Sequence, residues 1–268
     1  MNNIQDKKLF LLDMDGTIYL GGRLFDGTKE FLSYVKAIGG RYAFLTNNSS
    51  RGTESYIEKL RKMGIEAFPE DFVTSADAAI DFMLPKKEEL AIYICGTESL
   101  RRQFALAGFD VRTDLSDGIN LLLLGYDTEL TYKKLTDCVQ LINRGCSYMA
   151  THPDMVCPTE YGFAPDCGSV IEMLRTATGK APEKIFGKPQ PAMAEIAMKK
   201  YGFSKEESCL VGDRLYTDIA CAINAGISGC FVLSGEGKIA DIEKYGVQPT
   251  FIFKDIKEIL SALKGERK

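Results

Sequence analysis

Two acidic residues, Asp13 and Asp15, stand directly after the apolar run of residues 9–12 and are separated by a single residue. Such a run predicts a strand buried on both faces of a parallel sheet, and ligands bind at the carboxyl edge of such sheets. Two ionised carboxylates at that edge repel each other, and partial burial raises the free-energy cost of leaving them unpaired. The pair therefore predicts a site for a divalent cation.

A hydroxyl and two amides follow another apolar segment. Residues 42–45 lead directly into Thr46, Asn47 and Asn48. A strand that ends there presents hydroxyl and amide donors at the edge of the sheet, where they are suited to holding a phosphate oxygen. The segment is therefore a candidate phosphate-binding loop.

Two charged segments occur later in the chain. Lys188 stands directly before a proline, so it supplies a cation on a restricted backbone ahead of a helix-like run. The short apolar run 209–211 leads to Asp213, and Asp218 follows five residues further on. A second strand is thus expected to bring acidic groups to the same edge of a sheet.

Taken in order, these segments resemble the four motifs of the haloacid dehalogenase-type phosphatases. The motifs are DxDGT at residues 13–17, a threonine at a strand end, a lysine, and GDxxxTD at residues 212–218. A lone DxD pair is usually a solvated turn, whereas four ordered motifs at strand ends are not expected by chance. The resemblance covers essentially the whole chain and implies a Mg²⁺-dependent phosphatase with a Rossmann-like, doubly wound parallel sheet.

The resemblance assigns Asp13 as the nucleophile that forms an aspartyl-phosphate, and Asp15 as the general acid and then the general base. In an extended segment the two side chains project to the same side, because they are two residues apart. The implied ligands of Mg²⁺ are the Asp13 side chain, the Asp15 backbone carbonyl and the Asp213 side chain. Oxygen ligands of this kind suit the ion.

Phosphate contacts are expected from Thr46 and from the backbone amide of Asn47, with Asn48 as a further contributor. Lys188 is expected to offset the charge of the phosphate and the nucleophile. Asp218 either supports the metal shell, through a bound water or through Lys188, or is an ordinary helix-start residue.

Composition disfavours a polyanion-binding protein. The chain has 33 basic and 37 acidic residues, a net charge of −4 and no basic block, so nucleic-acid binding is not expected. None of its eight cysteines forms a C-x-x-C pair, which favours free thiols in a reducing cytosol over disulfides or zinc. Those that lie in apolar or helix-like runs, and are expected to be buried, are Cys95, Cys138, Cys221 and Cys230.

Residues 1–8 contain no apolar signal core, and no segment approaches the ~20 apolar residues of a membrane span. A soluble, cytoplasmic protein is therefore expected. Its expected partner is a small phosphorylated metabolite, not a nucleic acid or a membrane, and a homodimer is left open.

Apolar strand-like runs alternate with amphipathic stretches along the whole chain, which predicts an α/β architecture with parallel strands. The pattern restarts at about Asp77 without the catalytic residues, so we expect a catalytic core of residues 1–76 plus 183–268 and an inserted α/β domain of residues 77–182. The expected strands are residues 9–12, 42–45, 72–74, 91–96, 119–125 and 148–151, and the expected helices are residues 28–38, 53–63, 99–107 and 132–143.

An insertion between the second and third motifs resembles the C2-type cap of this family. Its βαβ-like repetition is most similar to class IIA, the NagD-like enzymes, which include nucleotidases, 4-nitrophenylphosphatases and pyridoxal phosphate phosphatases. The implied role of the cap is substrate specificity.

A turn-rich loop of the inserted domain carries Met155, Tyr161 and Phe163, which either pack on the leaving group or anchor a connector in the interior. The pyridoxal phosphate phosphatases have a histidine where an approximate alignment places Cys157, which disfavours pyridoxal phosphate as the substrate. His152 lies earlier in the loop and is expected to be a turn residue without a catalytic role.

The predicted function is Mg²⁺-dependent hydrolysis of small phosphomonoesters: sugar phosphates, nucleoside monophosphates and, in vitro, 4-nitrophenyl phosphate. Two alternatives stay open. One is a phosphotransferase or mutase that uses the same aspartyl-phosphate, and the other is a non-catalytic protein that binds phosphorylated metabolites.

Overall fold

The computed structural model describes residues 3–159 and 161–266, which form two compact α/β units. The first unit contains the chain up to Thr46, residues 53–73, and the chain from Lys188 onward. The second unit contains residues 47–52 and 74–187. The α/β fold class is confirmed.

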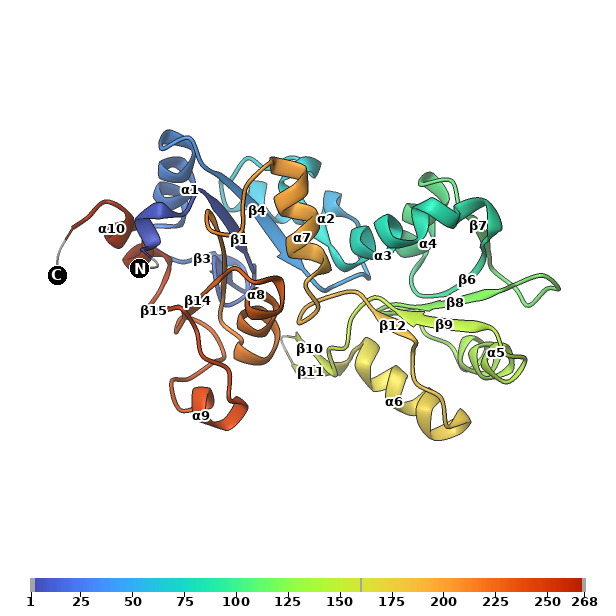
Figure 1. The fold of residues 1–268 in the computed structure, drawn as a ribbon. Coiled ribbons are helices and arrows are strands. Elements are labelled where there is room, and N and C mark those ends of the chain that lie inside the picture. The colour runs from blue at the N-terminus through green and yellow to red at the C-terminus, as the bar shows by residue number, and fades with distance from the viewer. Residues whose placement is uncertain (1–2, 160, 267–268) are drawn as a thin grey trace. The chain divides into compact units, whose positions relative to one another are not determined.

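A six-stranded sheet forms the centre of the first unit (Figure 1), and its neighbour pairs β1–β13, β1–β4, β13–β14 and β14–β15 are parallel. In spatial order its strands are β15 (Phe251–Phe253), β14 (Ser228–Val232), β13 (Ser208–Gly212), β1 (Leu9–Leu12), β4 (Arg41–Thr46) and β5 (Phe72–Thr74).

The direction in which successive strands are added to this sheet reverses at β1. From β1 the chain proceeds to β4 on one side, whereas β13 lies on the other side and is followed outward by β14 and β15. Leu12 is in register with Phe44 of β4 and with Val211 of β13. Ligands bind at such reversal points, outside the carboxyl ends of the strands, so β1 and β13 define the expected position of a site.

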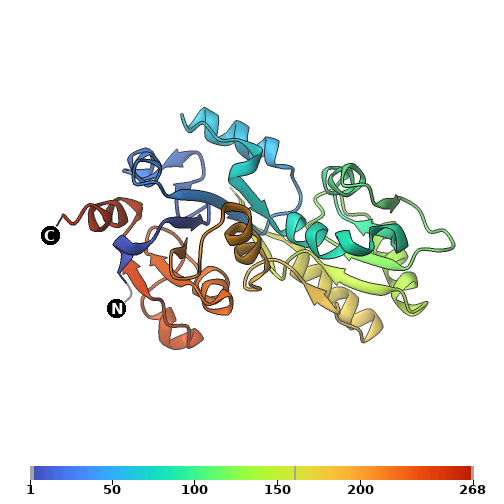
Figure 2. The ribbon, with the colours of Figure 1, turned by 45° about the horizontal axis from the view of Figure 1, so that its top comes forward.

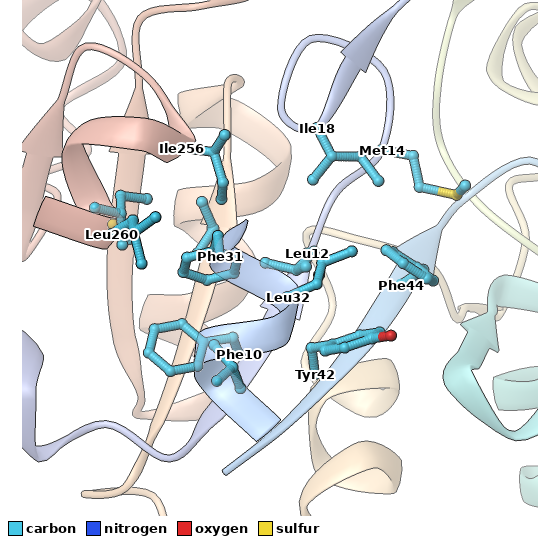
Figure 3. Packing of buried hydrophobic residues seen from close by; sticks show 14 of the residues in the cluster. Phe10, Leu12, Met14, Ile18, Phe31, Leu32, Tyr42, Phe44, Ile256 and Leu260 are labelled. Atoms are coloured by element: carbon cyan, nitrogen blue, oxygen red, sulfur yellow. The ribbon is translucent and has the colours of Figure 1, made fainter. Parts of the chain in front are cut away.

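Helices cover both faces of the sheet, and all four residues of β1 are fully buried. Phe10 and Leu12 share a core cluster with residues of α1 (Thr28–Ala37) and α10 (Ile256–Leu263), as Figure 3 shows. These two helices lie side by side in both ribbon views (Figures 1 and 2). The edge of the Phe10 ring meets the Phe31 ring at a centroid distance of 5.2 Å.

The remaining elements of the first unit are mostly short. Its helices are η1 (Ile4–Asp6), α2 (Thr53–Lys62), η2 (Pro69–Asp71), α7 (Ala192–Tyr201), the π-helical turn η4 (Leu215–Ile219), α8 (Ala220–Ala225) and α9 (Asp241–Tyr245). A small antiparallel hairpin is made of β2 (Tyr19–Leu20) and β3 (Arg23–Leu24).

The second unit is built on a five-stranded parallel sheet. In spatial order its strands are β12 (Lys184–Ile185), β9 (Ser147–Ala150), β8 (Leu121–Leu124), β6 (Ala91–Cys95) and β7 (Asp110–Arg112). Its helices are α3 (Ser75–Met83), η3 (Leu84–Glu89), α4 (Glu98–Leu106), α5 (Tyr132–Asn143) and α6 (Cys167–Thr178). An antiparallel hairpin consists of β10 (Val156–Thr159) and β11 (Gly162–Pro165).

The boundaries of the two units differ from those expected from the sequence. Lys184 and Ile185 pair with Met149 and Ala150 in the sheet of the second unit, and the first unit resumes only at Lys188, not at residue 183. The reason is that β12 is a two-residue edge strand, too short to show a hydrophobic period. Residues 47–52, expected in the catalytic core, also belong to the second unit.

All eight cysteines are free thiols, and the four expected to be buried are buried, which confirms that prediction. Among residues 3–159 and 161–266, every helix is too short or too polar to cross a lipid bilayer.

Candidate active site

Asp13 and Asp15 follow β1 and are turned away from the core. Met14, between them, is 3% exposed and packs near Ile18 and Phe44 in the core cluster (Figure 3). The Asp13 side chain is 18% exposed and the Asp15 side chain is 52% exposed. Both carboxylates are therefore accessible to a small substrate while the backbone between them is anchored.

Lys188 forms ion pairs with one carboxylate of the first motif and one of the fourth. Its Nζ lies 2.5 Å from Asp13 Oδ1 and 2.6 Å from Asp218 Oδ1, and its side chain is only 4% exposed. Burial by itself would lower the pKa of Lys188, but the two carboxylates outweigh burial and hold that pKa above its ordinary value. The ammonium group thus stays charged and fixes the direction of the Asp13 carboxylate.

Asp213 and Asp218 differ in how their oxygens are used. Asp213 Oδ2 accepts a hydrogen bond from the Glu236 amide at 2.7 Å, whereas its buried Oδ1 has no hydrogen-bond partner among the residues that the structure describes. Asp218 uses one oxygen for Lys188 and the other for the Arg214 amide, at 3.1 Å. Asp213 therefore offers an oxygen to a ligand, whereas Asp218 holds the residues around it.

The site concentrates negative charge. Carboxylate oxygens of Asp13, Asp213 and Asp218 lie within 4.8 Å of one another, and the Lys188 ammonium group pairs with Asp13 and Asp218. Burial raises the pKa of Asp13 to about 7, against the opposing effect of Lys188, and burial together with Asp218 raises that of Asp213 to about 6. A divalent cation with a preference for oxygen ligands fits this excess charge and the unpartnered Asp213 oxygen.

Three glycines make room for these carboxylates. A Cβ atom on Gly16 or Gly235 would lie 2.5 Å or 2.0 Å from Asp213 Oδ2, and one on Gly212 would lie 2.3 Å from Asp218. Gly16 also has a φ of +85°, which side-chain-bearing residues rarely adopt. The glycines of the first and fourth motifs are therefore needed for close approach, and Gly16 for the turn as well.

Thr46 ends β4 in the first unit and is 9% exposed, whereas Asn47 and Asn48 belong to the second unit. The Asn47 side-chain amide donates to Asp154 at 3.1 Å, and the Asn47 backbone carbonyl accepts from Ser75 Oγ at 2.5 Å. Asn48 Oδ1 accepts from the amide and the hydroxyl of the residue two positions further on. These contacts engage both asparagine side chains within the second unit, and phosphate binding by the Asn47 amide stays a prediction.

Comparison with known proteins agrees with this geometry. Residues 10–110 match the family model described as haloacid dehalogenase-like hydrolase, and residues 185–259 match the model described as HAD-hydrolase-like. An acid sugar phosphatase from Staphylococcus aureus is 34% identical over 256 residues, which cover 96% of this chain and 98% of that protein. The chain belongs to the haloacid dehalogenase-like hydrolases.

Solved structures of this family match both units. The 4-nitrophenylphosphatase of Thermotoga maritima has a TM-score of 0.91 and 38% identity, covering 97% of this chain and 98% of its own. The glycerol phosphate phosphatase of Mycobacterium tuberculosis in complex with magnesium has a TM-score of 0.88 and 32% identity, covering 97% and 79%. The predicted class IIA, NagD-like membership is confirmed, and the chain is a phosphomonoester hydrolase.

One loop of this hydrolase was not identified from the sequence as part of the site. Ser234 Oγ donates to the Gly16 carbonyl at 2.7 Å, and the Glu236 amide holds Asp213. The loop follows β14, so it shows the same pattern as the identified motifs, an apolar run that ends in polar residues and glycines. Because ligands bind at the carboxyl ends of parallel strands, this pattern predicts that the loop after β14 is part of the site.

The polar loop of the second unit differs from the expectation. His152 does not lie in a turn but is fully buried two residues after the end of β9, with Nδ1 2.9 Å from Thr151 Oγ and Nε2 2.9 Å from Asp166 Oδ1. Both ring nitrogens are satisfied, which explains why an isolated imidazole is tolerated there.

The three large apolar residues of this loop are not interior anchors. Met155 is 51% exposed, Tyr161 83% and Phe163 65%, and the last belongs to the hairpin of β10 and β11. The interpretation of the loop as a connector with buried anchors is therefore wrong.

Proposed function

We propose that this hydrolase uses Mg²⁺ to release phosphate from sugar phosphates and similar small metabolites, through an aspartyl-phosphate on Asp13. The observation that carries the proposal is the Asp13 carboxylate, held by the buried Lys188 ammonium beside an unpartnered oxygen of Asp213. The names of its relatives, an acid sugar phosphatase and a 4-nitrophenylphosphatase, support the substrate class.

Mg²⁺ would be held by the Asp13 side chain, the Asp15 backbone carbonyl and the Asp213 side chain. The bound ion supplies positive charge that offsets the phosphate and the carboxylates. Asp218 supports this site by holding Lys188. Thr46 and the Asn47 amide are assigned to the phosphoryl oxygens, with Asn48 as their neighbour.

The chemistry divides one displacement into two. An Asp13 oxygen attacks phosphorus, the bond from phosphorus to the ester oxygen breaks, and the leaving oxygen takes a proton from Asp15. Water then attacks the aspartyl-phosphate and gives a proton to Asp15, which releases phosphate and restores Asp13. Partial burial raises the pKa of Asp15, against the opposing effect of Lys59, which favours the protonated form required in the first step.

We assign the second unit the role of a cap that selects the leaving group. The exposed Met155, Tyr161 and Phe163 support this assignment, because exposed apolar side chains are suited to packing on a substrate. The eight free thiols fit a reducing compartment, and we place the enzyme in the cytoplasm as a catalyst acting on small phosphorylated metabolites.

Phosphate release tests the proposal. The purified protein with Mg²⁺ is expected to liberate inorganic phosphate from 4-nitrophenyl phosphate and from several members of a panel of sugar phosphates, nucleoside monophosphates and glycerol phosphate. Removal of the metal with EDTA is expected to lower the rate at least ~100-fold, because the carboxylates then repel the phosphate, and added Mg²⁺ is expected to restore it.

Two outcomes would contradict the proposal. Isomerisation of a sugar phosphate without release of phosphate would favour a mutase. Turnover that is unchanged after dialysis against EDTA would remove the metal from the reaction.

A further inference from the structure

Lys59 places a second cation beside the proposed acid. It lies on α2, and its Nζ is 3.8 Å from Asp15 Oδ2. The two side chains are 37% and 52% exposed, so the pair lies at the border of the solvent. No catalytic motif of the sequence includes Lys59.

The ring of Tyr19 fixes this ammonium group. Lys59 Nζ lies over the ring, 3.9 Å from its centroid, a short cation–π contact. Tyr19 is itself immobilised, because its residue is 2% exposed and its carbonyl accepts from the Gly16 amide at 2.7 Å. The segment that carries Asp15 thus also carries the ring that holds the Lys59 ammonium group near the Asp15 carboxylate.

Arg214 also lowers the pKa of Asp15, by less than Lys59 does. Its Nε pairs with Glu236 at 3.1 Å, so part of its charge is offset. Of these two cations, Lys59 therefore interacts more strongly with the Asp15 carboxyl group.

We propose that Lys59 is a positioning residue that holds the Asp15 carboxyl group for the proton transfer to the leaving group. The inference rests on the proposed function. In the step concerned, the Asp13–phosphorus bond forms, the phosphorus–ester bond breaks with its electron pair on the leaving oxygen, and the Asp15 proton moves to that oxygen. The new carboxylate then faces the Lys59 ammonium.

A poor leaving group needs this proton, and a good one does not. Lys59→Met is expected to lower kcat/KM for glycerol phosphate about tenfold, because a partly exposed charge pair interacts more strongly than a fully solvated pair and more weakly than a buried one. For 4-nitrophenyl phosphate, whose leaving group departs as a stable phenolate, kcat/KM is expected to stay within about twofold. The ratio kcat/KM reports the steps up to the first irreversible one, so the later hydrolysis of the aspartyl-phosphate does not affect the comparison.

Three variants control the experiment. Lys62→Met removes an exposed charge from the same helix, where Lys62 pairs with Glu58. It is expected to leave kcat/KM unchanged for both substrates. Lys59→Arg keeps the charge and is expected to restore most of the glycerol phosphate activity. Tyr19→Phe keeps the ring and is expected to behave like the wild type.

The inference is overturned if Lys59→Met lowers kcat/KM equally for both substrates, as a distorted fold would. It is also overturned if the variant lowers kcat/KM for neither substrate. Failure of the proposed function gives a different result, because the wild-type enzyme itself would then release no phosphate from glycerol phosphate.

Discussion

Asp13→Asn is expected to lower kcat for 4-nitrophenyl phosphate by at least ~10⁴-fold, since loss of a nucleophile removes the covalent route entirely. Asparagine has nearly the same shape and can still accept a hydrogen bond from Lys188, whose Nζ lies 2.5 Å from Asp13 Oδ1. The fold is therefore expected to be retained. Release of 4-nitrophenolate in the presence of Mg²⁺ measures the loss.

Asp26→Asn provides the matched control. Asp26 is an exposed acidic residue of the same unit, and its replacement changes the net charge by the same amount without touching the site. Wild-type activity is expected for it. Residual turnover above ~1% of wild type by a folded Asp13→Asn enzyme would contradict the assignment of the nucleophile.

Lys188→Met is expected to affect both stability and rate. The side chain is 4% exposed and neutralises Asp13 and Asp218, so its removal leaves two carboxylates near each other without their cation. Breaking a buried ion pair on one side costs about 3 to 5 kcal/mol of unfolding free energy. The rate is expected to fall about 10²- to 10³-fold with the loss of charge stabilisation at the phosphate. Urea unfolding of the metal-free protein measures the first effect, and phosphate release the second.

A double variant separates the two effects. Lys188→Met combined with Asp218→Asn removes one of the stranded carboxylates, so part of the stability is expected to return while the activity stays low. Lys199→Met, at an exposed position of α7, controls for the loss of a lysine. A Lys188→Met protein as stable as the wild type would show that the pair is not coupled in the folded state.

The strand-end motifs were the most predictable part of the site. Asp13, Thr46 and Asp213 each follow an apolar run that proved to be a strand, because such runs must be buried and their carboxyl ends meet at one edge of a parallel sheet. The predicted helix 132–143 has the bounds of α5. In the structure Thr131 caps its first turn by accepting a hydrogen bond from the Lys134 amide.

Other parts could not be predicted because tertiary contacts decide them. The hairpin of β10 and β11 contains Pro158 and Pro165, residues that normally argue against strands. Burial of His152 depends on Asp166, which lies fourteen residues away in the sequence. Lys59 contacts Asp15 because α2 lies beside the segment that holds Tyr19. No local sequence pattern predicts this contact.

The covalent intermediate is the central claim, and Asp15→Asn provides a way to trap it. This variant is expected to transfer phosphate from 4-nitrophenyl phosphate to Asp13, because that leaving group needs no proton, and then to stall because no base activates water. After acid quench, mass spectrometry of the peptides is expected to place one added HPO₃ group on Asp13, matched by a burst of one 4-nitrophenolate per active site. A burst without phosphate on Asp13, or phosphate on another residue, would contradict the account.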